Sequence, residues 1–292
     1  MHAYLIIAHK NPEQIKKLLS QIDDERNDIF LLFDKKSDVE SLTKFDYDLK
    51  YSKLYFADPV KINWGGYSQI QAELNLLTLA TKTNEYDYLH LISGQDLLIK
   101  SQDYIHDYFK NHQGEEFLNV APEGEATKKL IDKNTRYYYR YQEHIRKHTK
   151  NPFRIMLKYF QKISLGLQKL FKVNRHKKDH ITFYKGANWF SITNDFAKYV
   201  VSKTDYIHKL FHHSMCCDEI FLHTLFFNSE FSTKLANERL REIDWARGNG
   251  ESPYTYRIDD LEMLKESNKL FARKFDADVD SKIIDEILKL TK

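Results

Sequence analysis

Cysteine is scarce in this chain: Cys216 and Cys217 are the only two among 292 residues, and they are adjacent. The Cα atoms of a disulfide-bonded pair usually lie about 5.5–6 Å apart, whereas consecutive Cα atoms are about 3.8 Å apart. Adjacent cysteines therefore make a poor structural disulfide. Because structural disulfides are typical of oxidising compartments, the cysteine content predicts a reducing, cytoplasmic setting.

Targeting signals and long apolar runs are also missing. Residues 1–8 form an apolar run of strand length, with no basic segment before it and no cleavage site after it. No run approaches the ~20 apolar residues needed to cross a bilayer. The formal net charge of +3 favours no particular class of partner. We therefore expect a cytoplasmic protein that is soluble or lies on a membrane surface.

Common phosphate-binding and metal-binding motifs are absent as well. The sequence contains neither G-x-G-x-x-G nor G-x-x-x-x-G-K-[ST], so the dinucleotide-binding and P-loop variants of an α/β fold are unsupported. The His and Cys residues between positions 212 and 223 match no C-x₂-C pair and no H-E-x-x-H motif. The Asp-x-Asp motifs at 46–48 and 276–280 do not follow a buried strand. We therefore predict no metal site.

Strand and helix patterns alternate through residues 1–123. Short apolar runs predict strands at 3–8, 29–33, 54–56, 88–92 and 117–120. The intervening segments carry helical apolar spacing. A strand–helix–strand opening favours parallel strands joined by a right-handed crossover. The predicted fold class is therefore α/β with a central, mostly parallel sheet, in which these residues form the nucleotide-binding half.

Helix-start signals separate these strands. Asn11 is expected to cap the first helix, with Pro12 at its first position and Gln14 completing a capping box. Ser101 is expected to cap the helix that follows the strand at 88–92. With these boundaries we predict one domain over the whole chain, 1–292.

The strand at 88–92 runs into Ser93-Gly94-Gln95-Asp96. In an open α/β sheet, ligands bind beyond the carboxyl ends of the strands. Ser93, Gly94 and Asp96 are therefore candidate ligand-binding residues. The same residue types also make simple turns, and this stretch alone leaves both interpretations open.

Residues 124–185 have a different character and predict a basic helical insertion. Between Glu143 and Asp179 there is no acidic residue, while lysine and arginine accumulate and apolar residues at 153–171 recur at helical spacing. A basic helix with one apolar stripe is typical of a membrane-surface helix, and the alternative is a core-packing helix with a solvated basic face. Nucleic-acid binding is a third interpretation. No recognised module accompanies the charge, so we predict no nucleic-acid partner.

Residues 186–292 form the acceptor and catalytic half. Its patterns predict strands at 188–192 and 240–243, and helices at 195–201, up to Leu264 and at 278–290.

A further pattern, at 217–226, predicts a helix whose first turn holds Asp218 and Glu219. A helix N-terminus stabilises carboxylates by ~0.3–1 kcal/mol, so the two acids can be purely structural. Alternatively, Glu219 is a general base that takes a proton from a substrate hydroxyl. Arg257 and Lys274 could likewise hold a diphosphate or be ordinary surface charges.

Seven stretches, in the same order along nearly the whole chain, resemble one family. They lie at 4–10, 64–68, 91–96, 186–190, 218–219 with Thr224, 243–245, and 252–253 with 270–276. Here the chain resembles the core-2/I-branching β-1,6-N-acetylglucosaminyltransferases and the related protein xylosyltransferases (glycosyltransferase family 14). The family's animal members have a transmembrane anchor and lumenal disulfides. This chain shows neither, so it looks like a short, bacterial-type member.

The resemblance implies a GT-A-like nucleotide-sugar fold, inversion at the anomeric carbon and no metal requirement. By motif match, Glu219 is the catalytic base. Arg257 and Lys274 match the cations that take the place of a metal on the diphosphate, and His9 and Asp34 match the uridine side.

On the substrate side, the same resemblance makes Trp245 an acceptor-side aromatic and adds Trp189 and Asp218 as substrate-binding residues. The expected activity is transfer of a sugar, best guessed as N-acetylglucosamine, from a UDP-sugar to a hydroxyl of a carbohydrate acceptor. The UDP-sugar is a donor substrate, so no cofactor is expected.

For a bacterial-type member we expect a role in surface polysaccharide synthesis, with an acceptor on a lipid carrier and the helix at 153–171 resting on the inner face of the plasma membrane. Two alternatives remain open. One is a xylosyl or other hexosyl donor on the same scaffold, and the other is a non-catalytic nucleotide-sugar- or glycan-binding protein.

Overall fold

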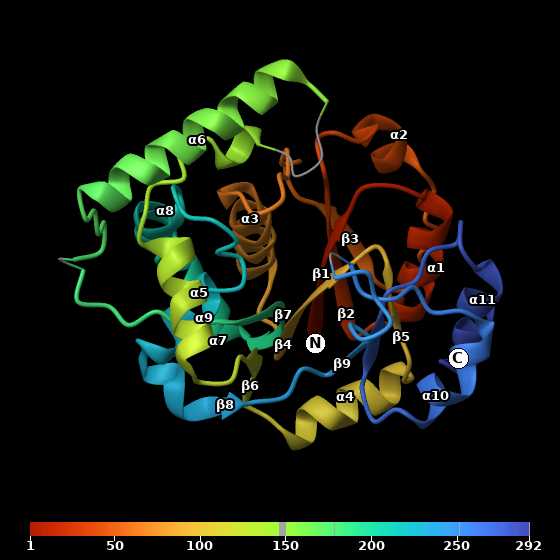
Figure 1. Cartoon of the computed structure of the whole chain (residues 1–292). Helices are drawn as coiled ribbons and strands as arrows, with labels where there is room; N and C mark the ends of the chain where they lie inside the picture. The colour runs from red at the N-terminus through yellow and green to blue at the C-terminus, as the bar shows by residue number, and fades with distance from the viewer. Residues whose placement is uncertain (146–149, 178, 251, 292) are drawn as a thin grey trace.

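The computed structural model describes residues 1–145, 150–177, 179–250 and 252–291, and its centre is a seven-stranded sheet (Figure 1). From edge to edge the strands are β3 (Lys53–Phe56), β2 (Asn27–Phe33), β1 (His2–Ala8), β4 (Tyr88–Ser93), β7 (Gly186–Thr193), β6 (Glu116–Val120) and β8 (Leu235–Ala236). Within this sheet β7 runs antiparallel to β4 and β6, and the other neighbouring pairs are parallel. The predicted α/β class with a mostly parallel sheet is confirmed.

The strands β1, β2 and β4 occupy the middle of the sheet because their sequences are apolar on both faces. Every residue of β2 and β4 is buried, and in β1 only Ile7 is partly exposed. Near-continuous apolar strands are typical of parallel sheets covered on both sides. The register pairs Ile7 with Ser93, so β1 and β4 end at the same level. Their carboxyl ends together form the edge at which such sheets bind ligands.

Helices cover both faces of the sheet and divide the core in two (Figure 1). One face is covered by α3 (Tyr67–Thr83), α7 (Asn194–Ser202), α8 (Thr204–Phe211) and α9 (Phe221–Phe227). The other face is covered by α1 (Pro12–Ile22), α2 (Val39–Lys44), α4 (Gln102–Asn111), α10 (Leu261–Glu266) and α11 (Ser281–Leu290). Short 3₁₀ turns occur in the connections at η1 (Gln142–His144), η2 (Glu230–Lys234) and η3 (Ile258–Asp260).

In its described residues the basic insertion contains the α-helices α5 (Glu125–Thr135) and α6 (Pro152–Leu170). Asn151 caps α6 by accepting a hydrogen bond from the N–H of Arg154, and the predicted helix is confirmed. In Figure 1, α6 (bright green) is the outermost element on its side of the molecule. Within the described parts of the chain, no helix combines the length and apolar character that crossing a membrane requires.

A second, smaller sheet joins β5 (Asp96–Leu98), β10 (Phe271–Arg273) and β9 (Arg241–Ile243). The sequence predicts a strand at 240–243, where β9 lies, but neither β5 nor β10. The antiparallel register places Arg273 opposite Asp96. Through this pairing the carboxyl-terminal segment reaches the end of β4.

The predicted cap of α1 is confirmed, but its capping box is wrong. The Asn11 side chain accepts a hydrogen bond from the N–H of Gln14 at 3.0 Å. The Gln14 amide does not return to the cap. It donates to the carbonyl oxygens of Gly94 and Phe275, both at 3.1 Å, and accepts from the N–H of Ala277 at 2.8 Å. These backbone groups would otherwise be buried without partners, so Gln14 satisfies them instead.

The helix expected to hold Asp218 and Glu219 starts later than predicted. It begins at Phe221, whose N–H donates to the carbonyl of Cys217 at 2.8 Å. The carbonyl of Glu219 accepts from the N–H of Gly186 at 2.9 Å, so β7 uses a group that a longer helix would need. The two carboxylates therefore lie in the turn that precedes α9.

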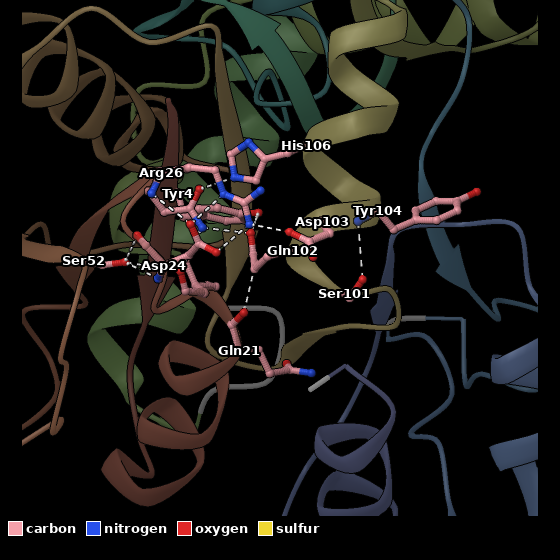
Figure 2. A network of polar contacts seen from close by, with 12 residues as sticks. Tyr4, Gln21, Asp24, Arg26, Ser52, Ser101, Gln102, Asp103, Tyr104 and His106 are labelled. Atoms are coloured by element: carbon pink, nitrogen blue, oxygen red, sulfur yellow. Dashed lines mark hydrogen bonds and ion pairs between the residues drawn. The ribbon is translucent and has the colours of Figure 1, made fainter.

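A polar network joins the amino ends of the central strands (Figure 2). Arg26 donates two hydrogen bonds to Asp24, at 2.8 and 2.6 Å, and one to Asp103 at 2.8 Å. The Gln102 side chain accepts from Tyr4 at 3.3 Å. The network attaches the start of α4 to β1 and β2, at the end of the sheet opposite to the carboxyl edge.

Candidate functional site

A cavity of about 230 Å³ lies at the carboxyl edge of the sheet, where β1 and β4 end. Among its lining residues, His9 follows β1, Ser93 and Gly94 end β4, and Trp189 belongs to β7. All four are candidates from the sequence. The structure therefore gathers residues from distant parts of the chain at the edge where α/β sheets bind ligands.

Gly94 allows the end of β4 to lie directly against β1. Its N–H donates to the carbonyl of Ile7 at 3.0 Å. A Cβ atom added here would lie 2.9 Å from the Cβ of Ala8 and 3.4 Å from Cγ1 of Ile15. Any larger residue would push the two strand ends apart, so this close approach requires glycine.

Asp96 holds the rim of the cavity together. Its Oδ2 accepts the N–H of Ser93 at 2.8 Å, and its Oδ1 accepts the Ser93 hydroxyl at 3.0 Å and the Arg273 guanidinium at 2.6 Å. Arg273 also bonds the Ser93 hydroxyl and lies over the Trp189 ring, 4.7 Å from its centre. Asp96 is only 2% exposed and both of its oxygens have partners. Its contacts position Ser93 and Arg273 for the cavity.

His9 lines the cavity, and Lys274, which does not line it, lies close enough for its charge to act on His9. The Lys274 ammonium forms no ion pair with any described residue, and its hydrogen-bond partner is the Ser252 hydroxyl at 3.4 Å. Burial lowers the pKa of Lys274. Burial also lowers the pKa of His9, and the charge of Lys274 lowers it further. Both cationic forms would be stabilised by an anion placed beside them.

Asp34 follows β2 and lies beside His9. Its N–H donates to the carbonyl of Ala8 at 3.0 Å, and its carboxylate pairs with Lys36 at 3.1 Å. The charge of Asp34 acts on His9 in the direction that raises the His9 pKa. The two residues expected on the uridine side are thus neighbours.

Glu219 lies in the turn before α9 and is partly accessible. Its carboxylate forms an ion pair with Lys185, and its side chain is 44% exposed while that of Lys185 is 14% exposed. The backbone bond to Gly186 ties this turn to the start of β7. Asn188, two residues along β7, lines the cavity. Glu219 therefore lies on an element adjoining the cavity and can be reached from solvent.

Asp218 faces inward, unlike Glu219. It accepts a hydrogen bond from Nε2 of Gln69 at 3.0 Å and is 8% exposed. Burial, and then the charge of Glu219, raises the pKa of Asp218 to about 7. Burial, and then the charge of Asp218, raises the pKa of Glu73 well above its usual range. Of these three carboxyl groups, Glu219 is the accessible one.

Arg257 and Trp245 do not line the cavity. Arg257 is exposed and follows Tyr256, whose N–H donates to the carbonyl of Lys274 at 2.9 Å. Trp245 is 54% exposed, and the adjacent Asp244 carbonyl accepts from the next segment of the same loop. Their predicted roles with the diphosphate and the acceptor stay predictions.

Sequence reasoning missed several lining residues: Gln69, Glu73, Gln95 and Asn188. For Glu73 a signal existed. It stands on the apolar face of α3, between Ile70 and Leu77, where an acid is unexpected. The polar amides have no such signal, because Gln and Asn are common throughout surface loops.

A sequence model of the family described as Core-2/I-Branching enzyme matches residues 2–266. The chain is 25% identical over 303 residues to Xylosyltransferase sqv-6 of Caenorhabditis briggsae, which covers 94% of this chain and 35% of that protein. It is 22% identical over 308 residues to Xylosyltransferase 2 of Homo sapiens, which covers 97% of this chain and 33% of that protein. The chain thus spans about one third of the length of these relatives.

Two solved structures align with the chain at low identity. The crystal structure of mouse Xyloside xylosyltransferase 1 in its apo form aligns with a TM-score of 0.38 and 11% identity, covering 93% of this chain and 97% of that one. Core-mannan synthase A from Aspergillus fumigatus aligns with a TM-score of 0.36 and 11% identity, covering 80% and 71%.

Proposed function

The chain belongs to the core-2/I-branching enzyme family, and from that premise we propose that it is an inverting glycosyltransferase. It moves a sugar, for which N-acetylglucosamine is our choice, from a UDP-sugar to a hydroxyl of a carbohydrate acceptor. The observation that carries the proposal is the meeting of His9, Ser93, Gly94 and Trp189 in one cavity at the carboxyl edge of the sheet, with Glu219 on the adjoining turn.

In this mechanism Glu219 is the general base. Its partial exposure lets an acceptor hydroxyl reach the carboxylate. As the acceptor oxygen attacks the anomeric carbon, its proton passes to Glu219. The bond from that carbon to UDP breaks on the opposite face through an oxocarbenium-like state, and UDP leaves with the electron pair. The new glycosidic bond therefore has inverted configuration.

Negative charge grows on the diphosphate as the sugar departs, and positive groups must stabilise it. We assign the stabilisation of the diphosphate charge to Lys274 and Arg257, without a metal ion. The support is that neither side chain forms an ion pair with a described residue and that the two lie on paired backbone segments. Arg273 is less suited, because its guanidinium already bonds Asp96.

The remaining assignments combine the lining of the cavity with the family resemblance. His9, Asp34, Ser93 and Gly94 take the nucleotide side, with Asp96 fixing the rim that Ser93 forms. The residues on the sugar and acceptor side are Trp189, Asp218 and Trp245.

A xylosyl donor is the second candidate, because the curated relatives described above are named xylosyltransferases. Purified protein incubated with UDP-N-acetylglucosamine, UDP-xylose and other UDP-sugars, each with a panel of oligosaccharide acceptors, distinguishes the two. Mass spectrometry of the products should show a mass increase of one N-acetylhexosamine. A pentose increment would establish the xylosyl alternative, and no increment with any donor would favour a non-catalytic binder.

We also propose a peripheral membrane contact through α6, because this helix carries its apolar stripe outward. Nine large side chains of α6 and its C-terminal cap are 37–75% exposed: Phe153, Ile155, Met156, Tyr159, Phe160, Ile163, Leu167, Leu170 and Phe171. Its inward contacts are partly polar. Gln161 accepts from the N–H of Tyr141 at 3.1 Å, and Gln168 accepts from the N–H of Tyr138 at 2.8 Å. A core-packing helix would instead bury the apolar stripe.

The charges around α6 favour an anionic lipid surface. The basic residues of this helix and its end are Arg154, Lys158, Lys162, Lys169 and Lys172, and the sequence from 150 to 177 has no acid. Apolar insertion and attraction to anionic headgroups then act together. Such a contact would bring the site to a polysaccharide acceptor on a lipid carrier at the inner face of the plasma membrane.

A further inference from the structure

Glu73 is a buried carboxyl group with an unsatisfied atom at the cavity. It lies in the second turn of α3, lines the cavity and is only 2% exposed. Its Oε2 is fully enclosed and has no hydrogen-bond partner among the described residues. A buried polar atom without a partner destabilises the fold, so such atoms are rare in native structures and usually have a functional reason.

The neighbouring side chains cannot supply the missing bond. The Gln69 amide lies on the same helix one turn before Glu73 and also lines the cavity. Its Oε1 already accepts from the N–H of Gly65 at 2.5 Å, and its Nε2 already donates to Asp218 at 3.0 Å. Asp218 repels an ionised Glu73. An apolar residue at position 73 would fit this face of α3 better, so folding alone does not account for the acid.

The cavity has the size and lining of a site for one sugar ring. At about 230 Å³ it lies below the ~300 Å³ at which pockets for drug-sized ligands begin, so it suits a single ring better than a whole nucleotide sugar. The Trp189 ring, with the Arg273 guanidinium over it, forms one wall, and Asn188 and Gln95 add amide groups. Hydroxyl groups combined with an apolar ring face are the chemistry of a sugar.

We propose that this cavity holds the transferred sugar and that the Glu73 carboxyl group hydrogen-bonds a hydroxyl or acetamido group of its ring. The inference rests on the proposed function and specifies the substrate within the same site. Glu73 is then a donor-specificity residue that contacts the sugar.

The charge around Glu73 also limits which sugars fit. Asp218 and Glu73 are both acids, and the cation at this end of the cavity, Arg273, is bonded to Asp96. Burial raises the pKa of Glu73 well above its usual range, so the protonated group can donate as well as accept. A carboxylate on the sugar would lie in the same cavity as the Glu73 carboxyl group, where the Arg273 guanidinium is already bonded to Asp96. We therefore expect the site to prefer an uncharged sugar to a uronic acid.

Isothermal titration of UDP, UDP-N-acetylglucosamine, UDP-xylose and UDP-glucuronic acid into the full chain tests the proposal without requiring an acceptor. The wild type should bind an uncharged UDP-sugar more tightly than UDP. It should bind UDP-glucuronic acid more weakly than the uncharged UDP-sugars. Glu73→Leu should bind UDP within about twofold of the wild type while the preference for the sugar falls at least about tenfold. Glu73→Gln, which keeps a hydrogen-bonding group of the same shape, should lose less.

A matched control is Glu116→Gln. Glu116 is also fully buried, but it accepts from the Thr193 N–H at 2.8 Å and lies on β6, outside the cavity lining. This variant should lose stability and keep the sugar preference. Glu73→Leu should unfold at the same temperature as the wild type or higher, whereas a purely structural role for Glu73 would lower that temperature.

The outcomes separate the inference from the proposed function. A wild type that does not bind UDP overturns both. A wild type that binds UDP but shows no preference for any uncharged UDP-sugar overturns the inference alone. The same holds if Glu73→Leu keeps the preference.

Discussion

Glu219 and Asp218 are consecutive residues whose side chains lie in different surroundings. Glu219 is 44% exposed and paired with Lys185, whereas Asp218 is buried against Gln69. The sequence located both acids and the family resemblance selected Glu219, but spacing along the chain could not say which of the two faces solvent. That difference depends on the turn before α9, whose backbone is fixed by β7.

Residue 73 shows how burial changes the pH dependence of folding. Burial raises the pKa of Glu73, so the folded chain keeps a proton that the unfolded chain loses above about pH 4.3. Stability of the wild type relative to Glu73→Gln should therefore fall as pH rises above that value, by up to ~1.4 kcal/mol per pH unit. Urea unfolding at pH 4.5, 6 and 8 measures this difference. A stability difference between the wild type and Glu73→Gln that is independent of pH would contradict the raised pKa of Glu73.

Lys274 is expected to stabilise the departing diphosphate. Lys274→Ala or Arg257→Ala should lower kcat/KM for the UDP-sugar at least about tenfold, or ~1.4 kcal/mol in transition-state stabilisation. Assays in EDTA keep divalent ions from masking the loss. Lys289→Ala is the control, because this lysine lies on α11 and pairs with Glu286. Activity that returns only with Mn²⁺ would contradict a role for fixed cations.

At the scale of elements, long periodic segments were easier to predict than short ones. The strands β1, β2 and β4 and the helices α1, α4 and α6 follow from apolar periodicity and capping residues. The pairing of β9 with β5 and β10 does not, because these short strands come from distant parts of the chain. The cavity depends on the sheet they form, since β10 carries Arg273. The cavity wall could therefore be predicted only in part.

The outward stripe of α6 makes a testable prediction about lipid binding. The wild type should float with vesicles of phosphatidylcholine and phosphatidylglycerol at low salt, and less so at high salt or with phosphatidylcholine alone. Ile163→Glu with Leu167→Glu should abolish flotation. The side chains of Ile163 and Leu167 are 59% and 51% exposed, so the unfolding temperature of the variant should change little. The control is the double variant Tyr104→Glu with Met263→Glu, because these two side chains are exposed on other elements.

Flotation that is unchanged by the α6 substitutions would contradict the proposed contact. Light scattering of the protein without lipid tests whether a second copy of the chain, and not a membrane, covers the apolar stripe of α6. A wild-type dimer that becomes a monomer in the double variant would show that a second copy covers α6 instead.

At the scale of the whole molecule, the two ends of the central sheet have different roles. The carboxyl edge carries the cavity and its charged rim. The amino edge carries buried, hydrogen-bonded polar groups, among them the network of Figure 2 and a histidine cluster beside it. The sequence predicted the first edge from strand ends, but it gave no sign of the second, because these histidines are scattered in sequence and meet only in the folded chain.

The histidine cluster should make the fold sensitive to acid. His90 bonds Ser191 at 2.9 Å and His2 at 3.2 Å, and His2 stacks on His106. Burial lowers the pKa of His90 well below 6.5, that of His2 to about 2 and that of His106 to about 4. The folded cluster stays neutral where the unfolded chain gains protons. Each histidine should therefore lower the unfolding free energy by ~1.4 kcal/mol per pH unit below about pH 6.5.

Unfolding in urea at pH 7.5, 6.5, 5.5 and 4.5 checks this expectation. His90→Gln does not titrate, so its stability relative to the wild type should improve steadily as pH falls below 6.5. Parallel pH profiles for the two proteins would show that His90 gains its proton in the folded state as well.

The most direct test of the account is the turnover of Glu219→Gln in EDTA, with UDP affinity measured on the same preparation. If Glu219 takes the acceptor proton, the variant should lose 10²- to 10⁴-fold in kcat while it binds UDP as tightly as the wild type. Turnover within a few fold of the wild type would contradict the central claim that this carboxylate is the catalytic base.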